Sequence, residues 1–399
     1  VPAGLIVQAD PVTDIAREEG ASPLWRLLGW WGGGAGFLIL SFYSVVAGWA
    51  MDYVFQTADG TFTGLSGSEV SAVFDDLVTD PGRMLAWHTI FMAMTIAVVA
   101  RGVRSGLEKA VRFLMPALFL LLLVLVGYAA NTGAFGAGLA FLFSPDFSKL
   151  TSAAMLEAMG HAFFTLSLGM GAIMVYGSYL PKRTSIAQTT FIIAGADTAV
   201  ALLAGMAIFP VVMAHGMQPE QGGAGLIFQS LTIAFGQMPG GVFFGTLFFV
   251  LLVFAAWTSA ISLIEPPVAW LVENHGMSRT NAATLTGAVI WLLGIASVLS
   301  FNEWAFSFEF AGKSRDTGIF DILSILTSSI MLPLGGMLIA LFAAWKMRRE
   351  SSMEELGMGN SLGYRLWWGV LRYVTPVLVF VVFLHVSGIL GYLIELVTS

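Results

Sequence analysis

The sequence predicts an all-α integral membrane protein in which one helix is broken at the middle of the bilayer. The 399 residues are 57% hydrophobic and 11% charged, whereas a soluble domain has about 25% charged residues. Nine segments are apolar for about 20 residues or more, the length that crosses a bilayer. One of them contains Phe163–Gly171, where two hydroxyl residues and two glycines weaken a helix. Because lipid cannot satisfy the backbone groups freed there, they must line a polar site.

The predicted spans follow one another with short connections. Their residue ranges are 26–54, 84–103, 110–131, 152–180, 185–215, 241–272, 279–299, 318–345 and 365–396. The glycine-rich stretch 216–240 is too interrupted to cross and favours a re-entrant or capping loop. We therefore divide the chain into an N-terminal segment, 1–25, and a transmembrane transporter domain, 26–399.

Basic residues predict the orientation. Placing 1–25 in the cytoplasm puts most of the eighteen lysines and arginines on that side, as the positive-inside rule requires. These are Arg17, Arg26, Arg101, Arg104, Lys109, Arg112, Lys182, Arg183, Arg279, Lys346, Arg348, Arg349, Arg365 and Arg372. We expect a multi-pass protein of the cell inner (plasma) membrane with a cytoplasmic N-terminus.

Several functional classes have no support. The chain has no cysteine, which excludes disulfides and thiolate metal sites. No zinc spacing of histidines and no protease or esterase motif occurs, so we do not expect an enzyme. No basic patch interleaved with aromatic residues indicates nucleic acid.

Asp197 lies deep in the fifth predicted span. A carboxylate at mid-bilayer costs about 2.5–3.5 kcal/mol on insertion scales, and none of the eighteen cations lies at the middle of a span. The group must be protonated, hydrogen-bonded or bound to a cation. We favour a cation ligand, with a neutral, hydrogen-bonded aspartate as the alternative.

Hydroxyl oxygens gather at two further places. Thr165 and Ser167 lie at the break, and Thr258 and Ser259 share one helix face with the Ala255 carbonyl. Hard cations prefer such oxygens. Close packing of helices through small residues is the alternative, and for the second group taken alone it is the better explanation.

Two other polar residues within spans need partners. The phenol of Tyr43 needs a hydrogen-bond acceptor, either a ligand carboxylate or a neighbouring carbonyl, and from the residues alone the carbonyl is the better explanation. Glu265 precedes Pro266 and Pro267, which lack amide donors. It is either a structural acid or part of an ion exit route, and we favour the structural acid.

From about Leu27 onward the chain resembles the neurotransmitter:sodium symporter family, in its bacterial amino-acid-transporter branch. The motifs that carry the resemblance are Phe163–Gly171, Ala255–Ser259, Ala204–Pro210 and the pair Gly106 and Pro116. They are similar to the unwound sixth helix, the eighth, the seventh and the fifth helix of that family. The resemblance implies the leucine-transporter inverted-repeat fold with discontinuous helices.

The resemblance also implies roles for single residues. It puts a first sodium site at Thr165 and Asp197, and a second at Ala255, Thr258 and Ser259. The implied substrate contacts are Ile39, Tyr43, Phe164, Thr165, Ser167, Met170, Ser259 and Leu263, with Tyr43 on the substrate carboxylate. The implied gate residues are Asp321 outside and Glu273 and Tyr179 inside.

The implied pocket offers no charge to a substrate side chain. A polar side chain would leave groups unpaired at about 1–3 kcal/mol each, so we expect a hydrophobic or aromatic amino acid, to which the flexible Met170 adapts. Sodium is the expected coupling ion. Asp197 stands where the chloride-requiring animal members have asparagine, which implies that chloride is not needed. A homodimer is left open.

The chain departs from the family at its beginning. Two helices that precede the segment near Arg26 are missing, and Val1–Val7 resembles a remnant of the second. We therefore expect an N-terminally truncated form that does not transport by itself. The alternatives are an ion channel or a ligand-sensing membrane protein on the same fold, or a half that pairs with a separate chain.

Overall fold

The structure, a computed structural model, describes residues 11–102, 106, 108–178, 180–181, 184–216, 225–310 and 313–390. Its α-helices are α1 (Pro11–Glu18), α2 (Arg26–Ala58), α3 (Gly67–Thr79), α4 (Pro81–Ala100), α5 (Lys109–Ala129), α6 (Phe135–Phe143), α7 (Ser152–Thr165), α8 (Ala172–Ser178), α9 (Ile186–Met213), α10 (Leu231–Gln237), α11 (Gly241–His275), α12 (Arg279–Leu299), α13 (Gly318–Ser324), α14 (Leu332–Leu341), α15 (Arg349–Leu356), α16 (Leu362–Gly369) and α17 (Thr375–Val386). Wider π-helical turns continue four of these runs at Leu226–Ser230, Ile325–Met331, Phe342–Lys346 and Val370–Val374.

Strands play almost no part in the described chain. β1 (Phe308–Phe310) and β2 (Lys313–Arg315) pair as a short antiparallel hairpin before α13. Every other regular element in the described residues is helical, which confirms the prediction of an all-α protein.

Eight helices of the described residues are long and apolar enough to cross a membrane. They are Pro23–Ala58, Pro81–Ala100, Lys109–Ala129, Ile186–Met213, Gly241–His275, Arg279–Leu299, Gly318–Lys346 and Leu362–His385. Eight of the nine predicted spans correspond to them. The remaining predicted span, 152–180, is divided into α7 and α8. The division lies at the glycines, where the sequence predicts a break. The predicted loop 216–240 instead contains a helix, Leu226–Gln237, that is too short to cross.

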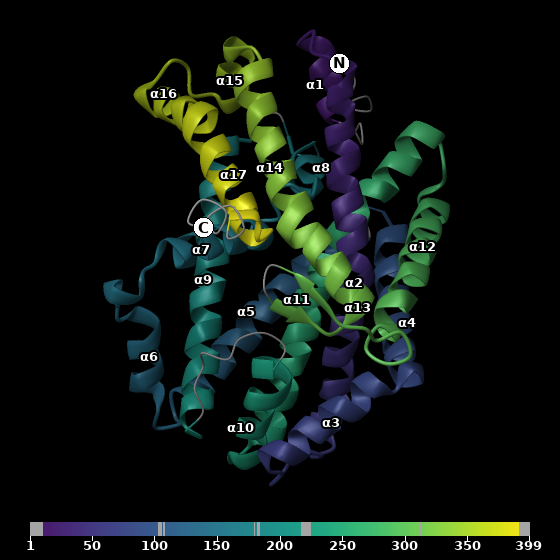
Figure 1. Cartoon of the computed structure of the whole chain (residues 1–399), viewed down its shortest axis with the longest axis vertical. Coiled ribbons are helices and arrows are strands. Elements are labelled where there is room, and N and C mark those ends of the chain that lie inside the picture. The colour runs from purple at the N-terminus through teal and green to yellow at the C-terminus, as the bar shows by residue number, and fades with distance from the viewer. Residues whose placement is uncertain are drawn as a thin grey trace, which may run out of the picture.

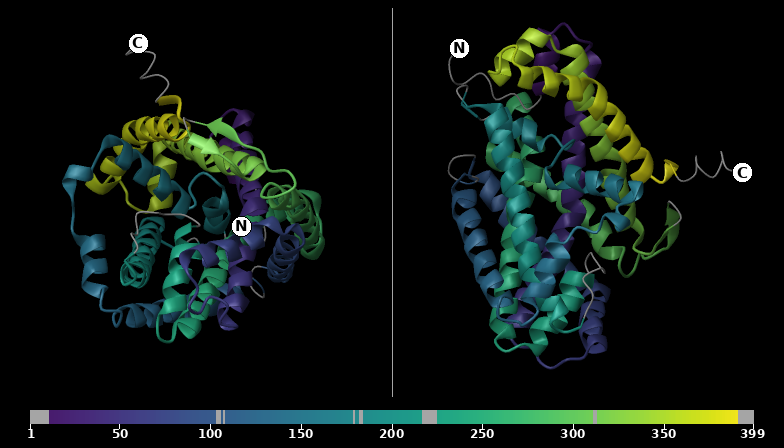
Figure 2. Two further views of the ribbon diagram at one scale, coloured as in Figure 1. Left: turned by 60° about the horizontal axis from the view of Figure 1, so that its bottom comes forward. Right: turned by 90° about the vertical axis from the view of Figure 1, so that its left-hand side faces the viewer.

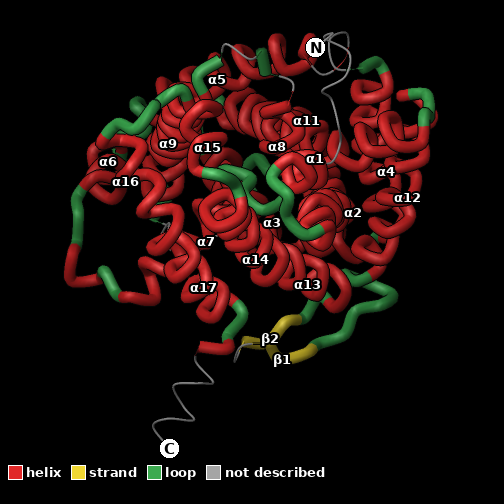
Figure 3. The backbone as a smooth tube through the Cα atoms, turned by 90° about the horizontal axis from the view of Figure 1, so that it is seen from above, coloured by secondary structure: helices red, strands yellow, loops and turns green. Residues whose placement is uncertain are grey.

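The centre of the molecule is α2, which runs almost its whole length (Figure 1). It packs along α11 on one side and against α4 and α12 on another, and the view along the bundle shows these four helices as neighbours (Figure 3). Apolar side chains at this contact, such as Ile39, Phe91 and Ile261, are fully buried. These four helices form the support against which the broken segment lies.

Two buried ion pairs fix helices of this support. Asp52 of α2 accepts hydrogen bonds from two residues of α4, from Arg83 at 2.8 and 2.7 Å and from Trp87 at 2.7 Å. At the other end, Glu265 of α11 is completely buried and pairs with Arg279. The interpretation of Glu265 as a structural acid is therefore confirmed. A buried carboxylate needs such a partner to remain ionised.

The two ends of the bundle differ in character. Helices α1, α15 and α16 lie at one end, with Arg17, Arg348, Arg349 and Arg365 on or beside them, and α3 and α10 lie at the opposite end (Figures 1 and 2). Helices α6, α9 and α5 form the far side, where α6 packs on α9 and α9 on α5.

Candidate substrate and sodium site

The backbone between α7 and α8 is not helical. Ser167 has φ of 55°, and among the described residues no other non-glycine residue has a positive φ. Gly169 and Gly171, with φ of 83° and 76°, take up the rest of the turn. The carbonyls of Leu166–Met170 accept no hydrogen bond within the described chain. Such strained, unpaired backbone inside a membrane domain is typical of a functional site.

Glycines let this segment press against its neighbours. A Cβ atom on Gly169 would lie 2.3 Å from the Leu332 carbonyl oxygen of α14, and one on Gly32 of α2 would lie 2.9 Å from the Gly171 nitrogen. Both distances are shorter than real carbon contacts. The broken segment is thus held between α2 and α14 by backbone contacts that only glycine permits.

A cavity of about 1080 Å³ opens beside the break. Its walls come from α2, the start of α5, the α7–α8 segment, α9 and α11. The residues that line it are Ile39, Tyr43, Glu108, Val111, Arg112, Met115, Phe164, Thr165, Leu166, Ser167, Met170, Ile173, Tyr176, Leu180, Ile193, Asp197, Thr258, Ser259, Ser262 and Leu263. All eight residues expected to touch a substrate are among them. The structure therefore brings together side chains that are up to 224 positions apart in the sequence, from Ile39 to Leu263.

The deepest part of the cavity is apolar. Ile39, Met170 and Leu263 are 1%, 4% and 6% exposed, and they come from α2, the break and α11. Phe164 is more open, at 38%. An apolar side chain would lose water from its whole surface here, which is favourable at about 25 cal/mol per Å².

Hydroxyl groups line the wall formed by α11. The Thr258 and Ser259 hydroxyls donate to the Ala255 carbonyl at 2.9 and 3.2 Å. Ser262 receives a hydrogen bond from Tyr176 at 3.1 Å. Because the protons of Thr258 and Ser259 are directed to a carbonyl, the lone pairs of these oxygens stay available as ligands. Ala255 itself does not line the cavity, and its carbonyl is already engaged by two hydroxyls.

Asp197 reaches the cavity from α9. Its side chain is half-buried, and in the described part of the chain no hydrogen bond or ion pair reaches the carboxylate. Thr165, at the end of α7, lines the same cavity and donates weakly, at 3.5 Å, to Ala162. A carboxylate in an apolar wall needs a proton or a cation. A cation brought into the cavity would supply the missing partner.

One charged part of the wall was not predicted from the sequence. Glu108 and Arg112, at the start of α5, line the cavity and pair with each other at 2.5 Å. The signal was an i, i+4 pair of opposite charge within the Gly106–Pro116 motif. Since these two charges cancel, Asp197 leaves the lining with a net negative charge that suits a cation.

Two of the expected gate residues, Asp321 and Glu273, do not line the cavity. Asp321 accepts hydrogen bonds from the Thr317 amide and hydroxyl, at 3.0 and 2.7 Å, and so caps the start of α13. Glu273 is half-buried near the end of α11. Tyr179 lies outside the described residues. The gating roles stay predictions.

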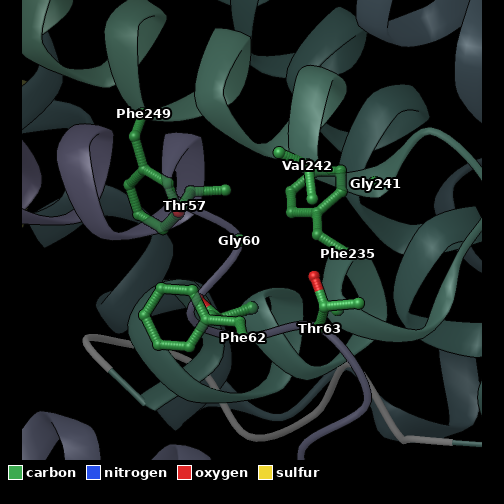
Figure 4. Close-up of a pocket in the computed structure, with 10 residues that line it drawn as sticks. Thr57, Gly60, Phe62, Thr63, Phe235, Gly241, Val242 and Phe249 are labelled. Atoms are coloured by element: carbon green, nitrogen blue, oxygen red, sulfur yellow. The ribbon is translucent and has the colours of Figure 1, made fainter.

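Two other kinds of site are absent or too small. No group of three or more histidine, cysteine or acidic side chains that could hold a metal occurs in the described ranges. A second pocket at the far end of α2, between Thr57, Phe62, Phe235 and Phe249, measures about 10 Å³ (Figure 4). That is room for about one water molecule, so an amino acid fits the large cavity but not this pocket.

Comparison with known proteins gives close relatives. A sequence profile of the Sodium:neurotransmitter symporter family matches residues 68–392. An uncharacterized sodium-dependent transporter of Bacillus subtilis is 38% identical over 95% of this chain and 83% of its own length. One of Haemophilus influenzae is 32% identical over 92% and 80%.

A solved structure matches the fold. The crystal structure of MhsT in complex with L-phenylalanine superposes with a TM-score of 0.83 at 40% sequence identity, over 96% of this chain and 85% of that one.

Proposed function

The chain belongs to the sodium:neurotransmitter symporter family and is a sodium-dependent, multi-pass membrane transporter with the leucine-transporter fold, and on this premise we propose that it couples sodium to the symport of a hydrophobic or aromatic amino acid. The observation that carries the proposal is the cavity at the broken helix. Its deepest part, lined by Ile39, Met170 and Leu263, is apolar, its α11 wall offers hydroxyl oxygens, and the Asp197 carboxylate has no partner among the described residues. The relative with bound L-phenylalanine supports an amino acid of this kind.

Sodium would serve two purposes in this cavity. Bound between Thr165 and Asp197, it would neutralise a carboxylate that the bilayer disfavours. Bound between Thr258, Ser259 and the Ala255 carbonyl, it would replace weak contacts within α11 by hard oxygen ligation. Because Asp197 is itself an anion, we propose that chloride is not required.

The substrate would lie between these oxygens and the apolar part of the cavity that Ile39, Met170 and Leu263 line. The Tyr43 phenol, which interacts with Ser259, would bind the substrate carboxylate, and Met170 and Leu263 would contact its side chain. Unpaired carbonyls of Leu166–Met170 would accept hydrogen bonds from the substrate amine. Binding of sodium and substrate together would close the outer side before the inner side opens, which is alternating access.

We further propose that the protein lies in the plasma membrane with its basic end in the cytoplasm. The arginines and lysines near α1, α15 and α16 support that orientation. The comparisons give no support to the expectation that residues 1–399 are inactive, and we do not propose it.

Equilibrium binding of radiolabelled L-phenylalanine tests the proposal. We expect saturable binding in sodium chloride and in sodium gluconate, and loss of binding in choline chloride. Leucine and tryptophan should displace the label, whereas lysine and glutamate should not. Equal binding in sodium and choline salts would contradict the proposal. Loss of binding in sodium gluconate would contradict the proposal that chloride is not required.

A further inference from the structure

Two arginines at the basic end of the molecule share one tryptophan. The guanidinium carbons of Arg349 and Arg372 lie 5.2 and 4.5 Å from the ring centroid of Trp368. Arg372 also lies 4.6 Å from the ring of Trp345. Guanidinium groups stack well on tryptophan. The stacking holds two like charges close together.

The fold fixes these arginines in place. The Tyr364 hydroxyl bonds the Ser352 hydroxyl at 2.6 Å and the Arg349 carbonyl at 3.1 Å, so that α15 is tied to α16. The Trp345 indole donates to the Arg372 carbonyl at 3.1 Å. Figure 1 shows α15 and α16 next to each other at the basic end. These bonds hold the two backbone segments next to each other, and stacking on Trp368 places the two guanidinium groups on one ring.

No acid of the described chain neutralises them. α15 carries Glu350, Glu354 and Glu355, but none of these forms an ion pair with Arg349 or Arg372. The Nε atoms of both arginines are buried without a partner. The Nη nitrogens of Arg372 have no partner among the described residues either, and they are not buried. Two uncompensated cations repel each other, and an anion would relieve the repulsion.

The surface beside these arginines is apolar. Leu366, Val370 and Tyr373 on α16 and the turn after it are 62%, 50% and 59% exposed, and Trp345 is 53% exposed. Tryptophan, tyrosine and arginine next to exposed aliphatic side chains are typical of the region where lipid headgroups meet acyl chains. A free anion in water would not cover these side chains, whereas a lipid would.

We propose that Arg349 and Arg372, with Trp345 and Trp368, bind the headgroup of an anionic phospholipid in the leaflet at the basic end of the molecule. The phosphate pairs with the guanidinium groups, and the acyl chains lie along Leu366 and Val370. Each arginine near a charged leaflet strengthens such binding about fivefold. The site is separate from the cavity, so its failure would leave the proposed transport untouched.

The test uses purified protein in detergent with added phosphatidylglycerol, phosphatidylcholine or inorganic phosphate. Lipid retained on the protein is measured by native mass spectrometry, and affinity by the shift of the thermal unfolding temperature. For the wild type we expect at least about tenfold tighter binding of phosphatidylglycerol than of phosphatidylcholine, and no comparable effect of phosphate. Equal retention of both lipids, or an equal effect of phosphate, would overturn the proposal.

Variants locate the site. Arg372→Gln and Arg349→Gln should each weaken phosphatidylglycerol binding about fivefold and leave phosphatidylcholine unchanged. The matched control is Arg26→Gln, an exposed arginine at the start of α2 with the same change in charge, which should have no effect. An equal loss in the control would overturn the proposal, because it would indicate general surface charge. If Arg372→Gln does not fold, Arg349→Gln and the comparison of the two lipids on the wild type still test whether this site binds an anionic lipid.

Discussion

At the scale of single residues, the proposed function depends on Asp197 and Met170. The first is a half-buried carboxylate with no partner in the described chain, and the second is an almost completely buried thioether at the break. Both line the same cavity but act on different ligands, an ion and a side chain. Their substitution should therefore produce different losses.

Asp197→Ala should remove sodium-dependent binding. Loss of a charge that pairs with a cation in a desolvated site costs about 2 kcal/mol or more, which is about thirtyfold in affinity. The measurement is a sodium titration of L-phenylalanine binding. Thr198→Ala is the control on the same helix, since Thr198 is exposed, bonds only to Ala194 and does not line the cavity. A sodium dependence in Asp197→Ala equal to that of the control would remove the residue from the site.

Met170→Phe should shift the preference toward smaller side chains. A larger, stiffer ring in a packed pocket costs about 1–3 kcal/mol for a bulky ligand, so the affinity for phenylalanine relative to alanine should fall about tenfold. Competition binding with a series of amino acids measures the ranking. The control is Leu168→Phe, two positions away and outside the lining. An unaltered ranking would discredit the proposed pocket.

At the scale of elements, the break between α7 and α8 follows from a local pattern, and other elements do not. Hydroxyls and glycines clustered in an apolar run are poor helix formers, which is why the interruption could be predicted. Helix α6 (Phe135–Phe143) is too short for a membrane span, and nothing in its composition separates it from a loop. Helix α3 was not predicted, although the Ser66–Glu69 capping box marks its start in the sequence.

The walls of the cavity could be predicted only in part. Residues at the break and on α11 carry the motifs that indicated them. Glu108 and Arg112 reach the cavity because α5 packs against α9 and α11. A local sequence pattern does not predict which distant segments pack together. The same limit applies to the contact between Gly169 and Leu332, which depends on where α14 lies.

Gly169→Ala tests the fit of the broken segment. The new methyl group would require φ near 83° and would collide with the Leu332 carbonyl oxygen, so we expect destabilisation by about 2–4 kcal/mol. Thermal unfolding in detergent measures it. Gly177→Ala in α8 is the control, since no atom lies within 4 Å of its added carbon, and it should be neutral or slightly stabilising. Equal unfolding temperatures for the two variants would contradict the described packing.

At the scale of the whole molecule, the basic end is joined across distant parts of the sequence. Glu19, directly after α1, accepts hydrogen bonds at 2.9 Å from the Arg348 amide and from its guanidinium. Burial raises the pKa of Glu19, but hydrogen bonds from Ser351 and Arg348 outweigh that effect and hold the pKa below its usual 4.5. The contact links the N-terminal segment to α15.

This link should depend on pH. A carboxyl group with a lowered pKa in the folded state stabilises the fold above its unfolded pKa, and the stabilisation is lost as pH falls through the folded pKa. The wild type should therefore unfold at a higher temperature than Glu19→Gln at pH 7, and the difference should shrink as the pH falls below the usual carboxyl pKa of 4.5 and through the lowered pKa of the folded state. Glu18→Gln, at an exposed neighbour, should behave as wild type throughout. A difference that persists at low pH would mean that the charge of Glu19 is not involved.

The most direct test of sodium-coupled symport is uptake of radiolabelled L-phenylalanine into proteoliposomes that contain the complete protein. We expect saturable accumulation above the external concentration when sodium is higher outside, and none after an ionophore has collapsed the gradient. Flux that does not saturate and persists without a sodium gradient would indicate a channel. Sodium-dependent binding without any flux would indicate a sensor. Either result would contradict the proposed symport.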